Sequence, residues 1–325
     1  MHQAWIVFLL SALLVYLAGT RLSASAEKIA RETGLGGLWM GLIILPLSTS
    51  LPELVSGWRA VSIGAPDLAV GNLLGSNLIN FFIIALIDLV QGRGSVFDHI
   101  SRSHKVAVTM VAFMSLLVIG GMLFPGLQLP VSPVTPLLLI AYLVAGRVLF
   151  RSRPQRAAAG PRRNSAVLTR AVLTYLASSA VIILAAVNLA DAAETLAEVT
   201  GLGRTFMGSF LLAISTSLPE VVTTTTAARL GALDMAVGNI LGANMFNLVL
   251  LFPLDIFHLR GPLLHALSPL HFFTGAMGIV LASLVYLGLA RPSRFVVGDI
   301  GLNSLLIAGG YIFTIGILYM WGMSF

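Results

Sequence analysis

Long apolar runs follow one another along almost the whole chain, and no other feature restricts its possible folds so strongly. About 20 apolar residues are enough to cross the hydrocarbon core of a bilayer as a helix. Only 10% of the 325 residues are charged, whereas a soluble domain carries about 25%. Transmembrane barrels are built from short segments of alternating hydrophobicity, which this sequence does not show. The sequence therefore predicts an all-α polytopic membrane protein.

The apolar runs divide into ten spans, five in each half of the chain. The predicted spans are 4–28, 35–61, 66–90, 104–124 and 130–149 in the first half, and 168–195, 202–228, 233–257, 270–290 and 297–321 in the second. We expect a first half at 1–150 and a second half at 167–325. A segment rich in Arg, Pro and Ala at 151–166 reads as an exposed linker between them.

The two halves carry the same motifs at a constant offset. STSLPE occurs at 48–53 and again at 215–220, which is 167 residues later. The same offset relates DLAVGNLLGSNLIN at 67–80 to DMAVGNILGANMFN at 234–247, Asp88 to Asp255, and His104 to His271. Because five is an odd number, the second half must enter the membrane in the opposite sense. This predicts ten transmembrane helices as two inverted five-helix repeats, a common plan for secondary transporters with a midplane substrate site.

The basic residues support this topology. With the N-terminus outside, 16 of the 19 Lys and Arg residues fall on the cytoplasmic side, and only Arg59, Arg204 and Arg260 face out. The positive-inside rule therefore predicts that both termini lie outside and the linker inside, in the plasma (inner) membrane. These loop positions also account for the net charge of +6, so no nucleic-acid partner is predicted. No Lys or Arg precedes the first span, which we expect to be mature structure rather than a signal peptide.

Glu53 and Glu220 each lie near the middle of an apolar span. A carboxylate at that depth costs about 2.5–3.5 kcal/mol or more, and such residues are functional by default. No Lys or Arg lies well inside any span, which argues against an internal ion pair. A protonated glutamate bonded to the backbone remains the alternative. We therefore expect a cation to be the partner of these carboxylates.

The residues around each glutamate add further oxygen atoms. Pro52 and Pro219 lack an N–H and clash with the carbonyl of residue i−4, so we expect broken or kinked helices. Carbonyls freed in this way are tolerated at membrane depth only where they are buried or line a cavity. Hydroxyl groups precede each glutamate within one helical turn; they belong to Thr49, Ser50, Thr216 and Ser217.

The second repeated motif combines small residues with amides. Its glycines form GxxxG pairs, which favour close helix packing. Ser76 and Asn80 lie four residues apart and share a helix face, and Ala243 and Asn247 are the matching pair. The other four asparagines are expected to bond to broken backbone or to cap helix ends; they are Asn72, Asn77, Asn239 and Asn244.

These groups form an all-oxygen set with two carboxylates. Hard cations such as Ca²⁺ take 6–8 oxygen ligands, whereas transition metals prefer His or Cys. The chain has no cysteine, and its six histidines lie at span ends or in loops, where we expect interfacial roles. A charge of −2 matches one divalent or two monovalent cations. No bound cofactor is predicted, because the ions would be transported.

At these motifs the sequence resembles the sodium/calcium exchangers of the cation/calcium antiporter superfamily. Those proteins carry hydroxyl-hydroxyl-x-Pro-Glu followed by Gly-Asn-x-x-Gly-Ser-Asn in two repeats. The resemblance implies ten transmembrane helices and alternating access, with Na⁺ and Ca²⁺ competing for one central cluster. It also implies long, tilted and mobile first and sixth helices at 4–28 and 168–195. The ligands it implies are Glu53 and Glu220, with further oxygens from Thr49, Ser50, Thr216, Ser217 and Ser76 and from the backbone carbonyls of Pro46 and Ala213.

Three positions depart from the pattern of better-known members. Asn247 stands where many carry Asp, Ala243 where many carry Ser, and Pro46 where a small residue is usual. A proton/calcium or other cation antiporter therefore stays open beside a Na⁺/Ca²⁺ exchanger. An intramembrane enzyme would need a Ser–His pair, an Asp pair or a metal-binding His motif at membrane depth, and none is visible. A transporter in the lipid bilayer, with Ca²⁺ and Na⁺ (or H⁺) as substrates, is the prediction.

Overall fold

The computed structural model describes residues 2–92, 94–123, 130–151, 164–199, 215–293, 295–298 and 300–322. Most of them are helical. The long helices are α1 (His2–Thr33), α4 (Leu51–Ser62), α5 (Pro66–Gln91), α6 (His104–Leu123), α7 (Val134–Arg151), α8 (Ser165–Val199), α10 (Leu218–Arg229), α11 (Leu233–Phe257), α12 (Leu270–Ala290) and α13 (Leu302–Gly322). Short helical turns are α2 (Gly37–Trp39), η1 (Met40–Ile44), α3 (Leu45–Thr49), η2 (Val96–Asp98) and η4 (Leu263–Ala266).

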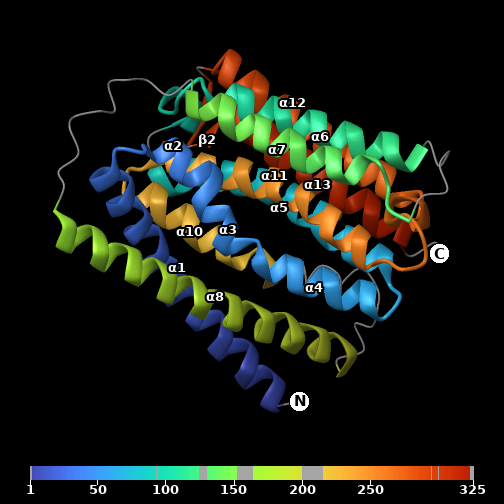
Figure 1. The fold of residues 1–325 in the computed structure, drawn as a ribbon. Helices are drawn as coiled ribbons and strands as arrows, with labels where there is room; N and C mark the ends of the chain where they lie inside the picture. The colour runs from blue at the N-terminus through green and yellow to red at the C-terminus, as the bar shows by residue number, and fades with distance from the viewer. Residues whose placement is uncertain are drawn as a thin grey trace.

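Two long helices, α1 and α8, lie together along one flank of the other helices (Figure 1). They contain 32 and 35 residues, so at 1.5 Å per residue each is about 48 Å long or more. That exceeds the hydrocarbon thickness of about 30 Å, so these helices must tilt or project from the membrane. They run antiparallel, because Val15 packs on Ala185 and Ala186 while Lys28 lies near Val167.

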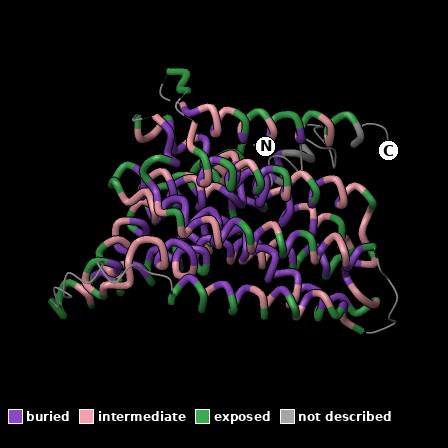
Figure 2. Tube along the Cα trace, turned by 90° about the horizontal axis from the view of Figure 1, so that it is seen from above, coloured by how far each residue is buried: buried purple, intermediate pink, exposed green. Residues whose placement is uncertain are grey.

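Helices α5 and α11 form the centre of the fold. In each, 72% of the most apolar 18-residue window is buried, against 22–44% in the other six candidate spans. Buried residues accordingly concentrate in the middle of the molecule, and exposed residues lie on the outer helices (Figure 2). The repeated DLAVGNLLGSNLIN and DMAVGNILGANMFN motifs begin these two helices, so they are placed at the core by their small and apolar residues.

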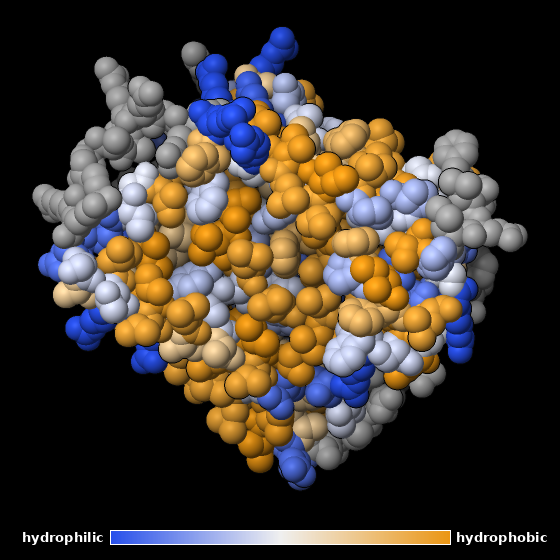
Figure 3. Space-filling view, in the orientation of Figure 1, coloured by the Kyte–Doolittle hydropathy of each residue, from blue (hydrophilic) through white to orange (hydrophobic). Residues whose placement is uncertain are grey.

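The exterior is suited to a bilayer. Eight helices of the described part are long and apolar enough to cross a membrane, or nine if the bent pair Gly37–Thr49 and Leu51–Ser62 counts as one span. Apolar residues cover most of the face shown in Figure 3, and large side chains such as Leu9, Leu173 and Leu184 are exposed. The predicted span 202–228 is described only from residue 215, and most of the 151–166 linker lies outside the described residues.

One predicted boundary is wrong. The last span was expected to begin at residue 297, but a short hairpin precedes it, with strand β1 (Val296–Val297) antiparallel to β2 (Ile300–Gly301). Gly298 has a φ of 61°, a left-handed conformation that glycine adopts without steric cost. The helix starts only at Leu302.

Aspartates near the starts of α5 and α11 join the two halves of the chain. Asp67 accepts hydrogen bonds from the Ser268 backbone N–H at 2.7 Å and from His271 Nε2 at 3.1 Å. At the position 167 residues later, Asp234 accepts from the corresponding groups of Ser101 and His104, at 2.7 and 3.0 Å. Each aspartate therefore binds the half of the chain to which it does not belong. The two histidines have a structural partner, which their predicted interfacial role did not include.

A second pair of aspartates makes equivalent contacts near the other ends of these helices. Asp88 accepts from the backbone N–H groups of Val96 and Gly301, at 2.7 and 2.9 Å. Asp255 accepts from the Leu263 and Ser132 N–H groups, at 2.6 and 2.8 Å, and from the Thr135 hydroxyl at 2.7 Å. Both aspartates are 0% exposed. Asp88 therefore ties α5 to the start of α13, and Asp255 ties α11 to the start of α7. Each of these contacts joins one half of the chain to the other.

The Asp255→Ala substitution is expected to lower the free energy of unfolding by about 3 kcal/mol. It leaves the buried backbone N–H groups of Leu263 and Ser132 without an acceptor, and each such group costs about 1–3 kcal/mol. The Thr135 hydroxyl keeps the Ser132 carbonyl as an acceptor. Thermal unfolding of the purified protein in detergent measures the change. Asp98→Ala is the control, because Asp98 is exposed on η2. Equal melting temperatures for the two variants would contradict the structural role of Asp255.

Candidate functional site

The first STSLPE motif breaks a helix inside the fold. The break falls at Ser50, between α3 and α4, and the two parts are bent by 41°. Pro52 takes one of the first two positions of α4, where its missing N–H would have had no helical partner. The second motif has the same local form, because Ser217 precedes α10 and Pro219 opens it. The first predicted helix break is therefore present, whereas the segment that leads into the second motif lies outside the described residues up to position 214.

Each motif glutamate lies in the first turn of the helix that follows the break. The N-terminal end of a helix carries a partial positive charge, which favours a carboxylate over its neutral form. Conversely, the C-terminal end of α3 reaches the break at Thr49 with its carbonyl groups, and such ends favour cations. The broken helix therefore supplies both an anionic side chain and negative backbone dipoles at one place.

The two carboxyl groups are buried together without a cationic partner. Glu53 and Glu220 are each 1% exposed, and they are close enough to interact electrostatically. Ser50 donates a hydrogen bond to Glu220 Oε1 at 3.3 Å. The other three carboxyl oxygens have no hydrogen-bond partner in the described part of the chain. Nor does any Lys or Arg there form an ion pair with them. The pair therefore has unused capacity to bind a cation.

Four more predicted oxygen donors share this property. The hydroxyls of Ser76 and Ser217 and the amide oxygens of Asn80 and Asn247 are buried and have no partner among the described residues. Each of these four side chains is at most 1% exposed. Buried polar groups are normally hydrogen-bonded, so an unpartnered buried oxygen is a candidate ligand for an ion or a water molecule. All four oxygens are therefore candidate ligands of a cation.

The other predicted ligands that the structure describes already take part in hydrogen bonds. Thr49 is a further hydroxyl neighbour of Glu220, although it also donates to the Leu45 carbonyl at 3.3 Å. Thr216 donates to Asn72 Oδ1 at 3.2 Å. The Pro46 carbonyl accepts the Ser50 N–H at 3.0 Å, so it was not freed by the break. Ala213 lies outside the described residues.

Three of the other motif asparagines neither cap helix ends nor bond to broken backbone, the two roles that were expected of them. Asn239 Nδ2 donates to the hydroxyls of Thr223 and Thr224, at 3.0 and 2.9 Å, and so ties α11 to α10. Asn77 and Asn244 bond to each other's backbone carbonyls inside intact helices. Sequence reasoning missed these roles because it could not place α5 against α11.

The donor set is oxygen-only in the part of the chain that the structure describes. No group of three or more His, Cys, Asp or Glu side chains that could hold a metal occurs there. A site of this kind depends on two carboxylates supplemented by hydroxyl, amide and carbonyl oxygens. Such a set suits Ca²⁺ and other hard cations rather than zinc or copper.

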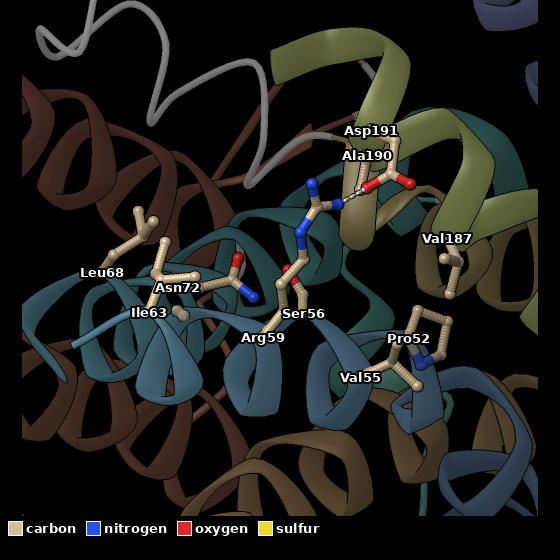
Figure 4. Close-up of a pocket in the computed structure, with 11 residues that line it drawn as sticks. Pro52, Val55, Ser56, Arg59, Ile63, Leu68, Asn72, Val187, Ala190 and Asp191 are labelled. Atoms are coloured by element: carbon tan, nitrogen blue, oxygen red, sulfur yellow. Dashed lines mark hydrogen bonds and ion pairs between the residues drawn. The ribbon is translucent and has the colours of Figure 1, made fainter. Parts of the chain in front are cut away.

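A pocket leads from the surface toward the break (Figure 4). Its volume is about 60 Å³, and it lies between α4, α5 and α8. That volume is enough for several water molecules. Pro52 and Asn72 line it on the side of the site, whereas Arg59 of α4 reaches Asp191 of α8 in an exposed ion pair across its mouth.

Helix α8 contacts the broken helix a second time. The Tyr175 hydroxyl donates to the Ile44 carbonyl at 2.6 Å and lies 2.7 Å from Ser48 Oγ. Ser179 Oγ also donates to Ser48, at 2.8 Å. These contacts precede Ser50 along the chain, while Arg59 follows it. The hydroxyl cluster and the ion pair therefore hold α8 on either side of the break.

The pocket predicts a pattern of cysteine reactivity. Because the chain has no cysteine, a single introduced thiol can be followed without background. Ser56→Cys lies in the pocket, so we expect a charged methanethiosulfonate reagent to modify it from water. Ser115→Cys should resist the reagent, because Ser115 is only 5% exposed inside α6. If Ser56→Cys is as unreactive as Ser115→Cys, the pocket does not admit water.

Together these features describe a helical membrane protein that buries two carboxyl groups without a basic partner in its described part. A family model for sodium/calcium exchanger proteins matches residues 3–148 and 170–320. The chain belongs to the sodium/calcium exchanger protein family. That family is one of membrane ion exchangers, which are transporters.

Several relatives cover most of the chain. The inner membrane protein YrbG of Escherichia coli (strain K12) is 30% identical, over 98% of each chain. The putative antiporter CaxA of Alkalimonas amylolytica is 28% identical over 77% of this chain and 79% of its own length. The sodium/calcium exchanger MaX1 of Methanosarcina acetivorans is 26% identical, over 81% and 85%.

A solved structure has the same fold. The sodium-calcium exchanger NCX_Mj, soaked with 10 mM Na⁺ and no Ca²⁺, superimposes with a TM-score of 0.76. The match covers 96% of this chain and 98% of that one, at 20% sequence identity. This likeness establishes the helical fold of the chain.

Proposed function

We propose that the protein is a secondary active antiporter that exchanges Ca²⁺ for Na⁺ at the site between the two STSLPE motifs. The observation that carries the proposal is the pair of buried carboxylates, Glu53 and Glu220, with three unpartnered oxygens and no basic partner in the described part. Burying two uncompensated charges is costly, and a bound cation removes that cost. The relatives named as sodium/calcium exchangers favour Na⁺ and Ca²⁺ as the ions.

The proposed ligands are those of the sequence prediction. Glu53 and Glu220 provide the charge, and oxygens from Thr49, Ser50, Thr216, Ser217, Ser76, Asn80, Asn247, Pro46 and Ala213 complete the coordination. A Ca²⁺ ion needs 6–8 of them. Two carboxylates balance one Ca²⁺ or two Na⁺ ions. Competition of the two ions for the same oxygens would couple their movements.

The proposed topology is ten transmembrane helices in two inverted halves, 1–150 and 167–325. Both termini lie on the outer, non-cytoplasmic side of the inner membrane. The cross-contacts of Asp67 with His271 and of Asp234 with His104 support it, because both repeat at an offset of 167 residues and exchange partners between halves. The charge distribution supports the orientation. The relative YrbG is an inner membrane protein.

In this mechanism, α1 and α8 slide past the other helices to expose the site to each side in turn. The motion has to break the contacts of α8 with the broken helix, namely Arg59–Asp191 on one side of Ser50 and Tyr175–Ser48 on the other. An empty site would carry uncompensated carboxylates past the apolar faces of these helices, which is costly. A loaded site is neutral, so only the loaded carrier crosses readily and leak is suppressed.

A proton/calcium antiporter is the second candidate. Asn247 gives the site an amide where many exchangers have a carboxylate, so fewer charges are available for several Na⁺ ions. A membrane glutamate can carry a proton as well as a metal ion. This candidate differs from the first in the coupling ion alone.

Ca²⁺ uptake into proteoliposomes tests the proposal and separates the two candidates. The vesicles are loaded with NaCl, with KCl, or with an acidic buffer, and diluted into a neutral Na⁺-free medium that contains ⁴⁵Ca²⁺. Na⁺/Ca²⁺ exchange predicts uptake only with NaCl inside. Uptake only with acid inside would assign proton coupling, and absence of uptake in all three conditions would refute Ca²⁺ antiport.

A further inference from the structure

Four asparagines form a reciprocal network where α5 crosses α11. Asn77 Nδ2 donates to the backbone carbonyl of Asn244 at 3.3 Å, and Asn244 Nδ2 donates to the backbone carbonyl of Asn77, also at 3.3 Å. The two residues are separated by the 167-residue offset of the duplication. The network therefore links the same point of both halves.

The backbone carbonyls fix the orientation of every amide in the network. A carbonyl oxygen only accepts, so the NH₂ group of Asn77 must face Asn244 O, and Asn77 Oδ1 must point the other way. There it accepts from Asn247 Nδ2 at 3.1 Å. By the same reasoning Asn244 Oδ1 accepts from Asn80 Nδ2, at 2.9 Å. Turning any one amide round would place two donors or two acceptors in contact.

Two amide oxygen atoms of the network accept no hydrogen bond within it. With their NH₂ groups engaged, Asn80 and Asn247 have only Oδ1 free, and both oxygens are buried without a partner in the described part of the chain. A cation is attracted by an amide oxygen and repelled by an amide NH₂ group. An asparagine therefore serves as an ion ligand only if its orientation is fixed.

Packing places Asn247 at the level of the helix break. Gly242 lies against Pro46, and Leu254 lies against Gly57. The segment from α3 to α4 thus runs beside α11, and Asn247 falls between these two contacts. Glu53 falls between Pro46 and Gly57 on the facing segment. The oxygen that the network sets free therefore lies at the same level along the helices as the proposed ion site.

We propose that Asn77 and Asn244 are positioning residues that hold the amide oxygens of Asn247 and Asn80 toward the transported ion. Neither touches the ion in this assignment; each acts through the amide to which it is bonded. The assignment rests on the proposed function, because it needs an ion at the site. It also explains how Asn247 can be an ion ligand, since the hydrogen bond to Asn77 fixes the direction in which the amide oxygen of Asn247 points.

A double-mutant cycle tests the assignment. Asn77→Ala frees the Asn247 amide to turn, so we expect the Ca²⁺ concentration for half-maximal uptake to rise about tenfold, the effect of one lost polar contact. The maximal rate should change much less. A carboxylate has an oxygen on both faces and needs no orientation. Adding Asn247→Asp to Asn77→Ala should therefore restore the half-maximal concentration to near the wild-type value.

Asn247→Asp has the opposite effect on Ca²⁺ uptake when Asn77 is present and the network is intact. Asn247→Asp alone places a carboxylate oxygen against Asn77 Oδ1, so it should impair uptake rather than improve it. Asn188→Ala is the control, because this exposed asparagine bonds only to the Leu184 carbonyl of its own helix in the described part. If Asn77→Ala does not fold, Asn244→Ala with Asn80→Asp provides the matching cycle in the other half.

Three outcomes would overturn the assignment. A lower melting temperature with an unchanged half-maximal concentration for Asn77→Ala would show that the network only holds α5 to α11. Additive effects of Asn77→Ala and Asn247→Asp would show that Asn77 does not act through Asn247. Wild-type protein that takes up no Ca²⁺ under any gradient would refute the proposed function itself, and the assignment with it.

Discussion

Glu220→Gln is expected to weaken Ca²⁺ binding by about 10³-fold and to abolish Ca²⁺ uptake at micromolar Ca²⁺. Removal of one partner from a buried charge pair costs about 3–5 kcal/mol, and every 1.4 kcal/mol changes an equilibrium constant tenfold. Glutamine keeps the size of the side chain and one oxygen. The loss therefore reports the missing charge rather than a packing defect.

Glu53→Gln should have an effect of the same size. Both oxygens of Glu53 lack a partner in the described part of the chain, and Glu53 occupies the same first-turn position in α4 as Glu220 in α10. The measurement is ⁴⁵Ca²⁺ uptake by proteoliposomes with equal amounts of folded protein.

Glu27→Gln serves as the control for both variants. Glu27 pairs with Arg31 one turn along α1, at the surface, where such pairs contribute little. Its uptake should match the wild type. Full uptake by Glu220→Gln would remove the carboxylate pair from the mechanism, and loss of uptake by Glu27→Gln would show that the assay responds to any charge change.

Gly242→Ala is expected to lower the free energy of unfolding by about 3 kcal/mol. A Cβ atom at this position would meet the Leu42 carbonyl oxygen, and it would lie 2.7 Å from Pro46 Cγ. Backbone on one side and a proline ring on the other cannot move aside as a flexible side chain can. Overpacking of this kind costs about 1–3 kcal/mol, and sometimes more.

The substitution should also disturb transport. Relief of the clash requires α3 to move away from α11, and Pro46 moves with it. The Gly278→Ala variant is the matched control: Gly278 is buried in α12, but apart from the adjoining backbone of its own helix no heavy atom of the described part lies within 4 Å of its added Cβ. Melting temperatures in detergent compare the two. An unchanged melting temperature for Gly242→Ala would contradict the close approach of α3 and α11.

The buried carboxyl groups and the broken helix could be predicted from the sequence, because a charge and a proline inside an apolar span are costly and are visible there. Glu53 interrupts an apolar span and follows Pro52 directly, so both the uncompensated charge and the broken helix can be read from one motif. The duplication then gave Glu220 the same role. GxxxG likewise indicated the close approach at Gly242, although not its partners Leu42 and Pro46.

Other features depended on contacts between distant segments. The sequence shows that His104 and His271 are equivalent, but only the fold brings them to Asp234 and Asp67, which are more than 100 residues away. The orientation of the Asn247 amide is a clearer case. It follows from a bond to Asn77 across two helices, and no local propensity encodes it. The hairpin before α13 was missed because Val296 and Val297 continue an apolar pattern.

The central claim is that one site, formed by both motifs, binds either Ca²⁺ or Na⁺. Calorimetric titration of the purified protein with Ca²⁺, repeated at increasing Na⁺ with K⁺ at constant ionic strength, tests it most directly. The account predicts that the apparent Kd for Ca²⁺ rises steadily with Na⁺ and that Glu220→Gln binds no Ca²⁺ in the same range. A Kd that does not respond to Na⁺, or Ca²⁺ binding that survives in Glu220→Gln, would contradict it.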